Sequence, residues 1–316
     1  MIITFKIPHG LNLAKQLEQA KLMIDYSFKS NLTIAENFKA FQLPIAIKRS
    51  TLKKYCSNKK TKKHRNIKLI VSKQEIVWKN NTVHIKCLKI VLPIKYNRHM
   101  SEVYQIELDN RYIYMSGKVE NERKEYYNGY VGVDINLTGY FAVVANPNTG
   151  KVLKLGKSLF HIKKKYRNIR VKLLRQKKYK AAWRVGRREA RIINNMCHQI
   201  SAKIVKYAKE NHCGIKLENL KGIRLNKGEG NYFLNNWPNY KLRVMILYKA
   251  KLLGIKTLII NPYNTSKKCS RTGEIGYRRG KYFKSSIGVE HADVNAAFNI
   301  ALARPACLII GRKSCQ

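Results

Sequence analysis

The stretch that decides the fold of the second half of the chain is YVGVDI, from Tyr130 to Ile135. It is apolar except for Asp134, and a short run of this composition predicts a buried strand. A second strand is expected over 139–145 and a third over 151–155, with turns at Gly139 and at 146–150 between them. Three meandering strands of this kind predict the beginning of a mixed sheet.

The elements that follow alternate between helix and strand. A basic helical region over 158–211 leads to a strand at 215–219, and a helix over 239–253 leads to a strand at 256–261. An excursion over 262–290 precedes a last helix over 292–303. The order β-β-β-α-β-α-β-insert-α is that of the RNase H architecture, a mixed α/β fold in which helices flank the sheet. There the first strand is central, the fourth lies beside it, and the last helix packs across both.

Three of the acidic residues occupy matched positions in this predicted fold. Asp134 lies in the first strand, Glu218 ends the strand at 215–219, and Asp293 opens the last helix. Taken alone, Asp293 is best interpreted as a helix N-cap, for which Asp is a preferred residue. Three carboxylates that converge would repel one another unless cations neutralise them, and ligation by oxygen alone suits Mg²⁺ or Mn²⁺. We therefore expect Asp134, Glu218 and Asp293 to be both metal ligands and catalytic residues of a two-metal phosphodiesterase.

The charge of the chain identifies the class of partner. Among 316 residues there are 64 Lys and Arg against 18 Asp and Glu, a formal net charge of +46, yet 45% of the residues are hydrophobic. The apolar share predicts a folded core, and the positive field predicts a polyanionic partner. Basic residues run through the whole chain with aromatics among them, which favours nucleic acid over a membrane surface.

The termini and the cysteines predict the compartment. No apolar run approaches the length that crosses a bilayer, and the first residues do not resemble a signal peptide. The seven cysteines are odd in number and irregular in spacing, which argues against a disulfide framework. We expect a cytoplasmic, nucleoid-associated protein of a prokaryote, with no membrane partner.

Two basic segments are candidate nucleic-acid contacts. Residues 151–191 hold 17 Lys and Arg against the single acid Glu189, too few acids for this to be an ordinary solvated face. A second patch lies on an expected loop that ends in KKTKKHR. The candidate contacts are Lys59, Lys60, Lys62, Lys63, Arg65, Arg184, Arg187, Arg188 and Arg191. Trp78, Trp183 and Trp237 are expected in the core, and His84, His161, His198 and His212 are expected to be ordinary core or surface residues.

The first part of the chain has a different character. Residues 2–7 alternate like a strand, 11–42 are expected to form one or two helices that end before Pro44, and short strands are expected around 67–71, 75–79, 82–94, 103–108 and 111–118. This pattern predicts a small antiparallel barrel or sandwich with a helical insertion at about 10–60. We expect one domain over 1–125 and a second over 126–316.

Three segments of the second domain resemble the RuvC motifs of TnpB proteins, which insertion sequences encode and which are relatives of the type V CRISPR effectors. These segments are GVDIN from Gly132, KLENLKG from Lys216 and HADVNAAFNIA from His291; residues 235–270 are also typical of the family. The resemblance covers about 129–303. It implies an RNA-guided DNA endonuclease that carries a guide RNA and cuts target double-stranded DNA, and proteins of this family are also called transposases. It assigns catalysis to Asp134, Glu218 and Asp293, and it makes the first domain a wedge-like barrel with a recognition insertion.

The chain departs from this family where other members carry a zinc ribbon made of two Cys-x-x-Cys pairs. Here Cys269 is the only ribbon cysteine that remains, Thr272 stands at the place of the second, and 283–291 contain no cysteine. Cys269 and His291 cannot complete four-coordinate zinc by themselves. We expect no structural zinc in this degenerate insertion at about 262–290, and a short loop that replaces or mimics the ribbon.

Two other functions compete with the nuclease. The loss of the ribbon favours a derivative that binds RNA or DNA without cutting, as a repressor would, whereas the retained acidic trio argues against it. A cut-and-paste transposase on the same fold usually runs Asp, Asp, Glu along the chain. The order here is Asp, Glu, Asp, which favours the RuvC interpretation.

Overall fold

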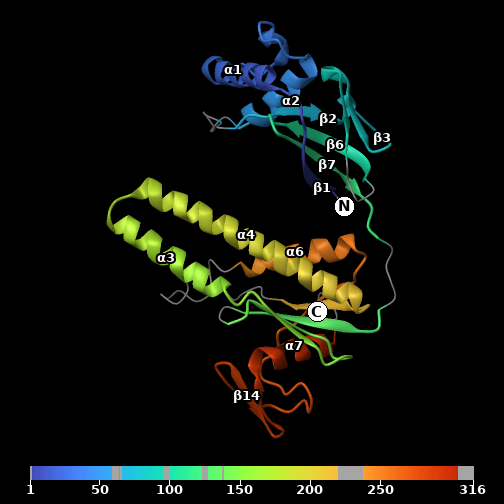
Figure 1. Cartoon of the computed structure of the whole chain (residues 1–316), viewed down its shortest axis with the longest axis vertical. Coiled ribbons are helices and arrows are strands. Elements are labelled where there is room, and N and C mark those ends of the chain that lie inside the picture. The colour runs from blue at the N-terminus through green and yellow to red at the C-terminus, as the bar shows by residue number, and fades with distance from the viewer. Residues whose placement is uncertain are drawn as a thin grey trace, which may run out of the picture. The chain divides into compact units, whose positions relative to one another are not determined.

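The computed structural model describes residues 2–58, 64, 66–94, 100–122, 127–136, 139–219 and 238–304. The chain divides into two compact units, one that ends at Asn121 and one that begins at Glu122. Each unit is built around its own sheet, and each is described by itself (Figure 1). Within the described ranges, no helix is both long and apolar enough to cross a membrane.

The first unit contains two antiparallel sheets. In the larger one the strand order is β1 (Ile2–Pro8), β7 (Tyr112–Val119), β6 (Met100–Leu108) and β2 (Leu69–Ser72). The smaller one is made of β3 (Ile76–Lys79), β4 (Thr82–Ile85) and β5 (Ile90–Pro93). The single strand expected over 82–94 is two strands, because a 3₁₀ turn and a left-handed Lys89 divide it. The closed barrel expected for this unit stays a prediction.

Two α-helices cover the larger sheet, and one of them was not expected. Helix α1 (Ala14–Ser30) lies in the predicted helical stretch and buries Met23 and Ile24. Helix α2 (Ile45–Cys56) begins directly after Pro44 and packs on β2. Pro44 was expected to follow the helical stretch at 11–42. It also precedes α2, because the fixed φ of proline suits the start of a helix. The five basic candidates at 59–65 lie outside the described residues, as does Trp237.

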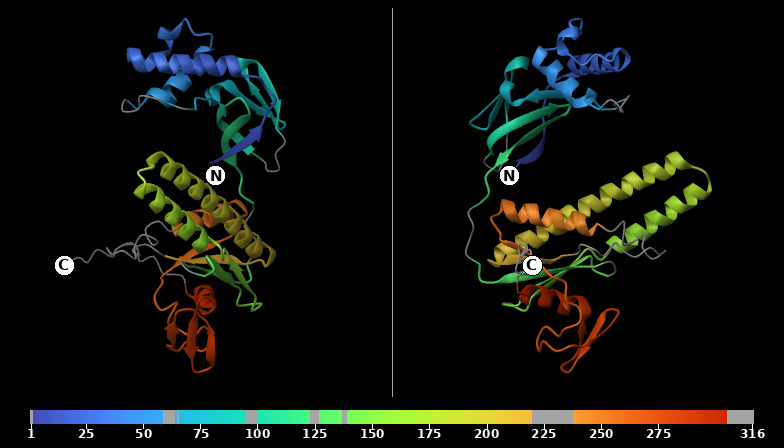
Figure 2. Two further views of the ribbon diagram at one scale, coloured as in Figure 1. Left: turned by 60° about the vertical axis from the view of Figure 1, so that its left-hand side comes forward. Right: turned by 180° about the vertical axis from the view of Figure 1, so that it is seen from behind.

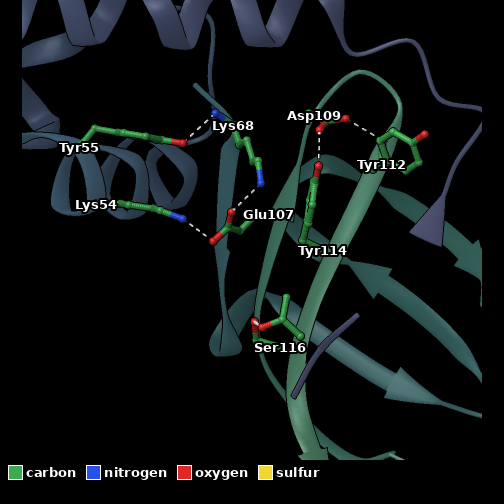
Figure 3. A network of polar contacts seen from close by, with 9 residues as sticks. Lys54, Tyr55, Lys68, Glu107, Asp109, Tyr112, Tyr114 and Ser116 are labelled. Atoms are coloured by element: carbon green, nitrogen blue, oxygen red, sulfur yellow. Dashed lines mark hydrogen bonds and ion pairs between the residues drawn. The ribbon is translucent and has the colours of Figure 1, made fainter. Parts of the chain in front are cut away.

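The acids of the first unit tie its strands together. Glu107 on β6 forms ion pairs with Lys54 of α2 and with Lys68, whose Nζ lies 3.1 Å from Oε2 of Glu107 (Figure 3). Asp109 follows β6 and accepts a hydrogen bond of 2.9 Å from the hydroxyl of Tyr114 on β7. These two acids have structural partners on neighbouring elements.

The second unit contains a five-stranded mixed sheet. Its order is β10 (Val152–Leu155), β9 (Ala142–Ala145), β8 (Tyr130–Ile135), β11 (Gly214–Glu218) and β12 (Thr257–Ile260). Strands β8, β11 and β12 are parallel, and β9 and β10 form an antiparallel meander with β8. The first strand of the unit is therefore central and the fourth lies beside it, which confirms that part of the predicted topology.

Helices cover both faces of this sheet (Figures 1 and 2). The basic region after β10 is two helices, α3 (Leu159–Arg175) and α4 (Tyr179–Glu210), which are joined at a left-handed Lys177. Helix α4 packs with α6 (Asn239–Leu252) over one face of the sheet. Helix α7 (Ala292–Leu302) packs on the other face, over β8 and β9.

Gly132 allows α7 to approach the sheet closely. A Cβ at this position would lie 2.1 Å from the carbonyl oxygen of Ala297 and 2.4 Å from the backbone nitrogen of Ala301. No side chain fits there, so the backbone of α7 rests directly on β8. The glycine of the first motif is thus explained by a helix that follows more than 150 residues later.

The insertion between β12 and α7 folds as a small sheet. Strands β13 (Tyr277–Arg279), β14 (Tyr282–Ser285) and β15 (Gly288–His291) are antiparallel, and β15 runs directly into α7. The fully buried Phe283 packs with Cys269 and Ala292. The expected short loop is therefore a three-stranded sheet that has a core of its own.

Candidate active site

Asp134 and Glu218 lie side by side on the two central strands. Val133 of β8 is paired with Leu217 of β11, and the strands are parallel, so the next residues along each strand are neighbours. Asp134 also lies opposite Val143 of β9, and Val143 packs with Ala297 of α7. Residues directly opposed in an antiparallel pair share a face of the sheet. The carboxylate of Asp134 is therefore on the face that α7 covers.

Asp293 reaches the same place from the first turn of α7. Helix α7 is held on this face by Lys216, whose Nζ donates hydrogen bonds of 2.6 Å to the carbonyl oxygens of Ala301 and Ala303 at the other end of the helix. The side chains of Asp134 and Asp293 are both buried. Strand β8, strand β11 and helix α7 thus bring together the three acids that the sequence singles out.

The pKa of Asp134 responds to both of the other carboxylates. Burial raises the pKa of Asp134 to about 7, and the negative charges of Glu218 and Asp293 add to this rise. A hydrogen bond of 2.9 Å from Nδ2 of Asn136 partly offsets it. A buried acid whose pKa is raised by its burial and by neighbouring carboxylates is typical of a functional site.

Glu218 is held by the start of the insertion. The hydroxyl of Thr265 donates a hydrogen bond to Oε1 of Glu218, and the same hydroxyl lies 3.1 Å from the carbonyl oxygen of Pro262. Burial raises the pKa of Glu218, while the hydrogen bond from Thr265 and the charge of Arg278 lower it. Glu218 therefore has a fixed orientation at the end of β11.

Arg278 is a member of this site that the sequence did not indicate. It lies on β13 of the insertion, and its Nη2 donates a hydrogen bond of 2.8 Å to Oδ1 of Asp293. Its positive charge also lowers the pKa values of Asp134 and Glu218, so it faces all three acids. In a chain with 64 Lys and Arg, nothing in the sequence distinguishes this arginine.

The donor set fits a hard divalent cation in its chemistry. All three side chains offer carboxylate oxygens, which are the ligands that Mg²⁺ and Mn²⁺ prefer, and burial together with the charges of Glu218 and Asp293 raises the pKa of Asp134. In the described part of the chain, however, no three His, Cys, Asp or Glu side chains stand close enough to hold a metal ion as they are placed. Asp293 pairs with Arg278 and Glu218 with Thr265.

The four basic candidates on α4 fall into two pairs. All four are expected contacts. Arg187 and Arg191 line a cavity with a volume of about 420 Å³, and Arg184 and Arg188 are not part of its lining. The same cavity is lined by His198, which was expected to be an ordinary residue. Trp183, which was expected in the core, is 55% exposed, so that expectation is wrong.

Cys269 of the insertion is buried and forms hydrogen bonds instead of a disulfide. Burial alone would raise the pKa of its thiol, but hydrogen bonds from the side chain and backbone of Thr272 and from the backbone of Arg271 hold the pKa below its usual value. Thr272 thus contacts the sulfur from the position where the second ribbon cysteine would stand. His291 ends β15 beside Asp293, and burial lowers its pKa.

The second unit is a mixed α/β fold that carries three acidic residues on neighbouring elements. Comparison with known proteins shows which proteins the chain is similar to. Residues 240–300 match the family model described as Cas12f1-like, TNB domain, a stretch that contains the insertion and Asp293. The chain is 34% identical over 195 residues to a CRISPR-associated endodeoxyribonuclease Cas12f1 of Sulfoacidibacillus thermotolerans, a match to 55% of this chain and 46% of that protein. It is 37% identical over 90 residues to the TnpB-like protein MJ0751 of Methanocaldococcus jannaschii, covering 27% and 32% of the two chains.

The chain is thus a relative of the TnpB-like proteins and of the Cas12f endodeoxyribonucleases, which confirms the resemblance seen in the sequence motifs. It spans less than half the length of these two curated relatives. Its fold is similar to that of the protein in a cryo-EM structure of a Cas12f1–sgRNA–target DNA complex. That likeness has a TM-score of 0.56 at 17% identity, and it covers 91% of this chain and 81% of the other.

Proposed function

We propose that this protein is an RNA-guided DNA endonuclease of an insertion sequence, which cleaves target DNA at the site formed by Asp134, Glu218 and Asp293. The observation that carries the proposal is the convergence of three acids from β8, β11 and α7, whose burial and mutual repulsion raise the pKa of Asp134 to about 7. The Cas12f1 relative is named an endodeoxyribonuclease, which supports nuclease activity. The similar Cas12f1 structure is a complex with sgRNA and target DNA, which supports guide RNA and DNA as partners.

Each residue of the site would have its own role. The three carboxylates would hold divalent cations, Mg²⁺ or Mn²⁺, which when bound supply an activated water and stabilise the leaving oxygen of a phosphodiester. Arg278 would leave Asp293 for the phosphate of the strand to be cut, since a guanidinium binds phosphate as well as carboxylate. Thr265 would keep Glu218 oriented. The basic helices α3 and α4 would contact the nucleic-acid backbone.

The test uses the whole chain expressed with the DNA that flanks its gene, so that a guide RNA can copurify and be sequenced. The complex is expected to cut DNA that matches this RNA when Mg²⁺ or Mn²⁺ is present and to be inactive in a chelator. Asp134→Asn should abolish cleavage while RNA and DNA remain bound. Unchanged cleavage by Asp134→Asn would refute the site, and the absence of any copurifying RNA would refute guidance.

A second function is favoured by one observation, the ion pair between Arg278 and Asp293. An arginine that stays on Asp293 would replace a cation, and the protein would then bind nucleic acid without cutting it. Tight binding of matching DNA with no cleavage at any divalent cation concentration would support this alternative. Cleavage by the wild type that is lost in Asp134→Asn would exclude it.

A further inference from the structure

A cavity lies between α4 and α6, on the face of the sheet opposite to the acidic trio. It has a volume of about 420 Å³. Three of its lining side chains carry a positive charge and none carries a negative charge. The lining residues are Arg187, Ala190, Arg191, Asn194, Asn195, His198 and Lys241. Cations together with amide and imidazole groups around one small cavity are complementary to a phosphate group in charge and in hydrogen bonding.

The cavity is preformed by the packing of the two helices. Nζ of Lys249 on α6 donates hydrogen bonds of 2.5 Å to the carbonyl oxygen of His198 and of 2.7 Å to Oγ of Ser201, both on α4. Beneath the two helices, Cys197, Leu242 and Ile246 are buried in the common core. The cationic side chains are therefore close together before an anion binds, and this preorganisation lowers the entropic cost of binding.

The pKa of His198 reflects the positive charges around the cavity. Burial lowers the pKa of His198, and the charges of Lys249 and Lys241 lower it further. Glu189 is the one acid on α4 close to this stretch; it is buried and forms an ion pair with Arg170 of α3 at 3.1 Å. Glu189 therefore has a cationic partner on α3, and the lining of the cavity contains no acid.

An aromatic platform adjoins the cavity. Trp183 lies one helical turn before Arg187, and the guanidinium carbon of Arg187 is 4.8 Å from the centre of the Trp183 ring. Trp183 is nevertheless 55% exposed. An exposed indole beside an arginine that also lines a cavity with positively charged walls is the combination that holds an unpaired nucleotide, because the base stacks on the ring while the cations hold the phosphate.

We propose that the α4–α6 cavity is a binding site for one strand of nucleic acid, with a backbone phosphate between Arg187, Arg191 and Lys241 and an unpaired base on Trp183. The proposal deepens the nucleic-acid function proposed above and rests on it, but it concerns a site apart from the acidic trio. It commits to a single strand because a base inside a duplex has no free face for the indole.

The experiment measures the binding of fluorescein-labelled single-stranded RNA, single-stranded DNA and duplex DNA to the full chain in chelator. We expect Trp183→Ala to weaken single-strand binding about 5- to 150-fold, which corresponds to one lost stacking contact. Trp183→Phe should retain most of the affinity. Duplex affinity should change much less in both variants. Comparison of the RNA and DNA arms then identifies which strand uses the site.

The phosphate part of the site is tested with two matched double variants. Arg187→Ala with Arg191→Ala removes two cations of the cavity, whereas Arg184→Ala with Arg188→Ala removes two arginines of the same helix, at the same spacing, that do not line it. The cavity variant should flatten the salt dependence of single-strand binding by about 0.7 in the log–log slope, which corresponds to the loss of one phosphate contact. Single-strand binding should also quench indole fluorescence in the wild type and in the control variant.

Wild-type single-strand affinity in Trp183→Ala would overturn the proposal, and so would equal salt slopes in the two double variants. Unchanged circular dichroism and thermal unfolding would show that the variants are folded. The result is also separable from the proposed nuclease. Asp134→Asn should bind single strands as the wild type does, and Trp183-dependent binding without any cleavage would refute the nuclease while the cavity site stood.

Discussion

Arg278 and Asp293 are joined by a hydrogen-bonded ion pair of 2.8 Å that links the insertion to the first turn of α7. The charge of Asp293 raises the pKa of Asp134, and the guanidinium of Arg278 is the only side chain that the described residues place in an ion pair with Asp293. The pair therefore stabilises the acidic trio when no metal is bound. It also sets up a competition, because a divalent cation and Arg278 require the same carboxylate.

This competition predicts opposite effects of Arg278→Ala on metal affinity and on cleavage. The affinity for Mn²⁺ in the absence of nucleic acid should rise about 5-fold, which corresponds to about 1 kcal/mol for a partly exposed ion pair. Cleavage should fall, since the proposed contact with the phosphate is lost. Calorimetric titration with Mn²⁺ and a cleavage assay measure the two effects.

Arg279→Ala is the matched control, because Arg279 is exposed on the same strand and, within the described structure, pairs with none of the three acids. It should leave both the Mn²⁺ affinity and the cleavage rate close to those of the wild type. A loss of Mn²⁺ affinity in Arg278→Ala would contradict the competition between arginine and metal.

The raised pKa of Asp134 predicts an unusual dependence of stability on pH. Because the pKa is about 7 in the folded state and 3.8 without the fold, the folded protein binds the proton more tightly between these values. In chelator, this residue's contribution to the free energy of unfolding should therefore be fully present below about pH 4 and be lost as the pH rises through 7, a fall on the order of 4 kcal/mol. Asp134→Asn should remove this fall, which denaturant titrations at several pH values would show.

Asp109 provides the control of opposite sign. Burial would raise its pKa, but hydrogen bonds from the backbone N–H groups of Arg111 and Tyr112 and from the Tyr114 hydroxyl lower the pKa below its usual value. Its contribution to stability is present at neutral pH and is lost as the pH falls through the folded pKa. Asp109→Asn should thus destabilise the protein at pH 7. The same pH trend for both variants would contradict the assignment for Asp134.

The acidic trio could be predicted from the sequence because acids are rare in this chain and because each member lies in a segment with clear strand or helix character. The position of Asp134 in an apolar strand is the strongest such signal. Arg278 could not be predicted in this way, because its contact with Asp293 depends on how the small sheet packs next to α7. Trp183 was misplaced because the apolar stripe of α4 is buried mainly from Ile193 onward, and Trp183 lies before it.

The insertion should fold without metal. Its core is the fully buried Phe283 with Cys269 and Ala292, and Thr272 hydrogen-bonds to the cysteine sulfur. Elemental analysis should therefore find no stoichiometric zinc, and a chelator should leave the insertion resistant to proteolysis. Phe283→Ala should destabilise the insertion by about 3–5 kcal/mol, as expected for an aromatic side chain removed from a core.

Limited proteolysis of the whole chain measures this effect, because cleavage between 262 and 291 should become fast in Phe283→Ala and stay slow in the wild type. Tyr282→Ala is the control, since Tyr282 lies on the same strand and is exposed. One equivalent of bound zinc, or fast cleavage of the wild type after chelation, would show that the insertion depends on metal after all.

The close approach of α7 to β8 predicts that Gly132→Ala separates the acids without removing any of them. The added Cβ would overlap the backbone of α7 at Ala297 and Ala301, and a helix backbone cannot move aside as a flexible side chain can. We expect a loss of about 1–3 kcal/mol in stability, as for other overpacked cores. Because α7 carries Asp293, cleavage should fall far more than this loss explains, and Mn²⁺ affinity should fall with it.

Gly10→Ala is the control, since a Cβ at Gly10 meets nothing within 4 Å. Wild-type cleavage by Gly132→Ala would show that the reaction does not depend on the distance between α7 and β8.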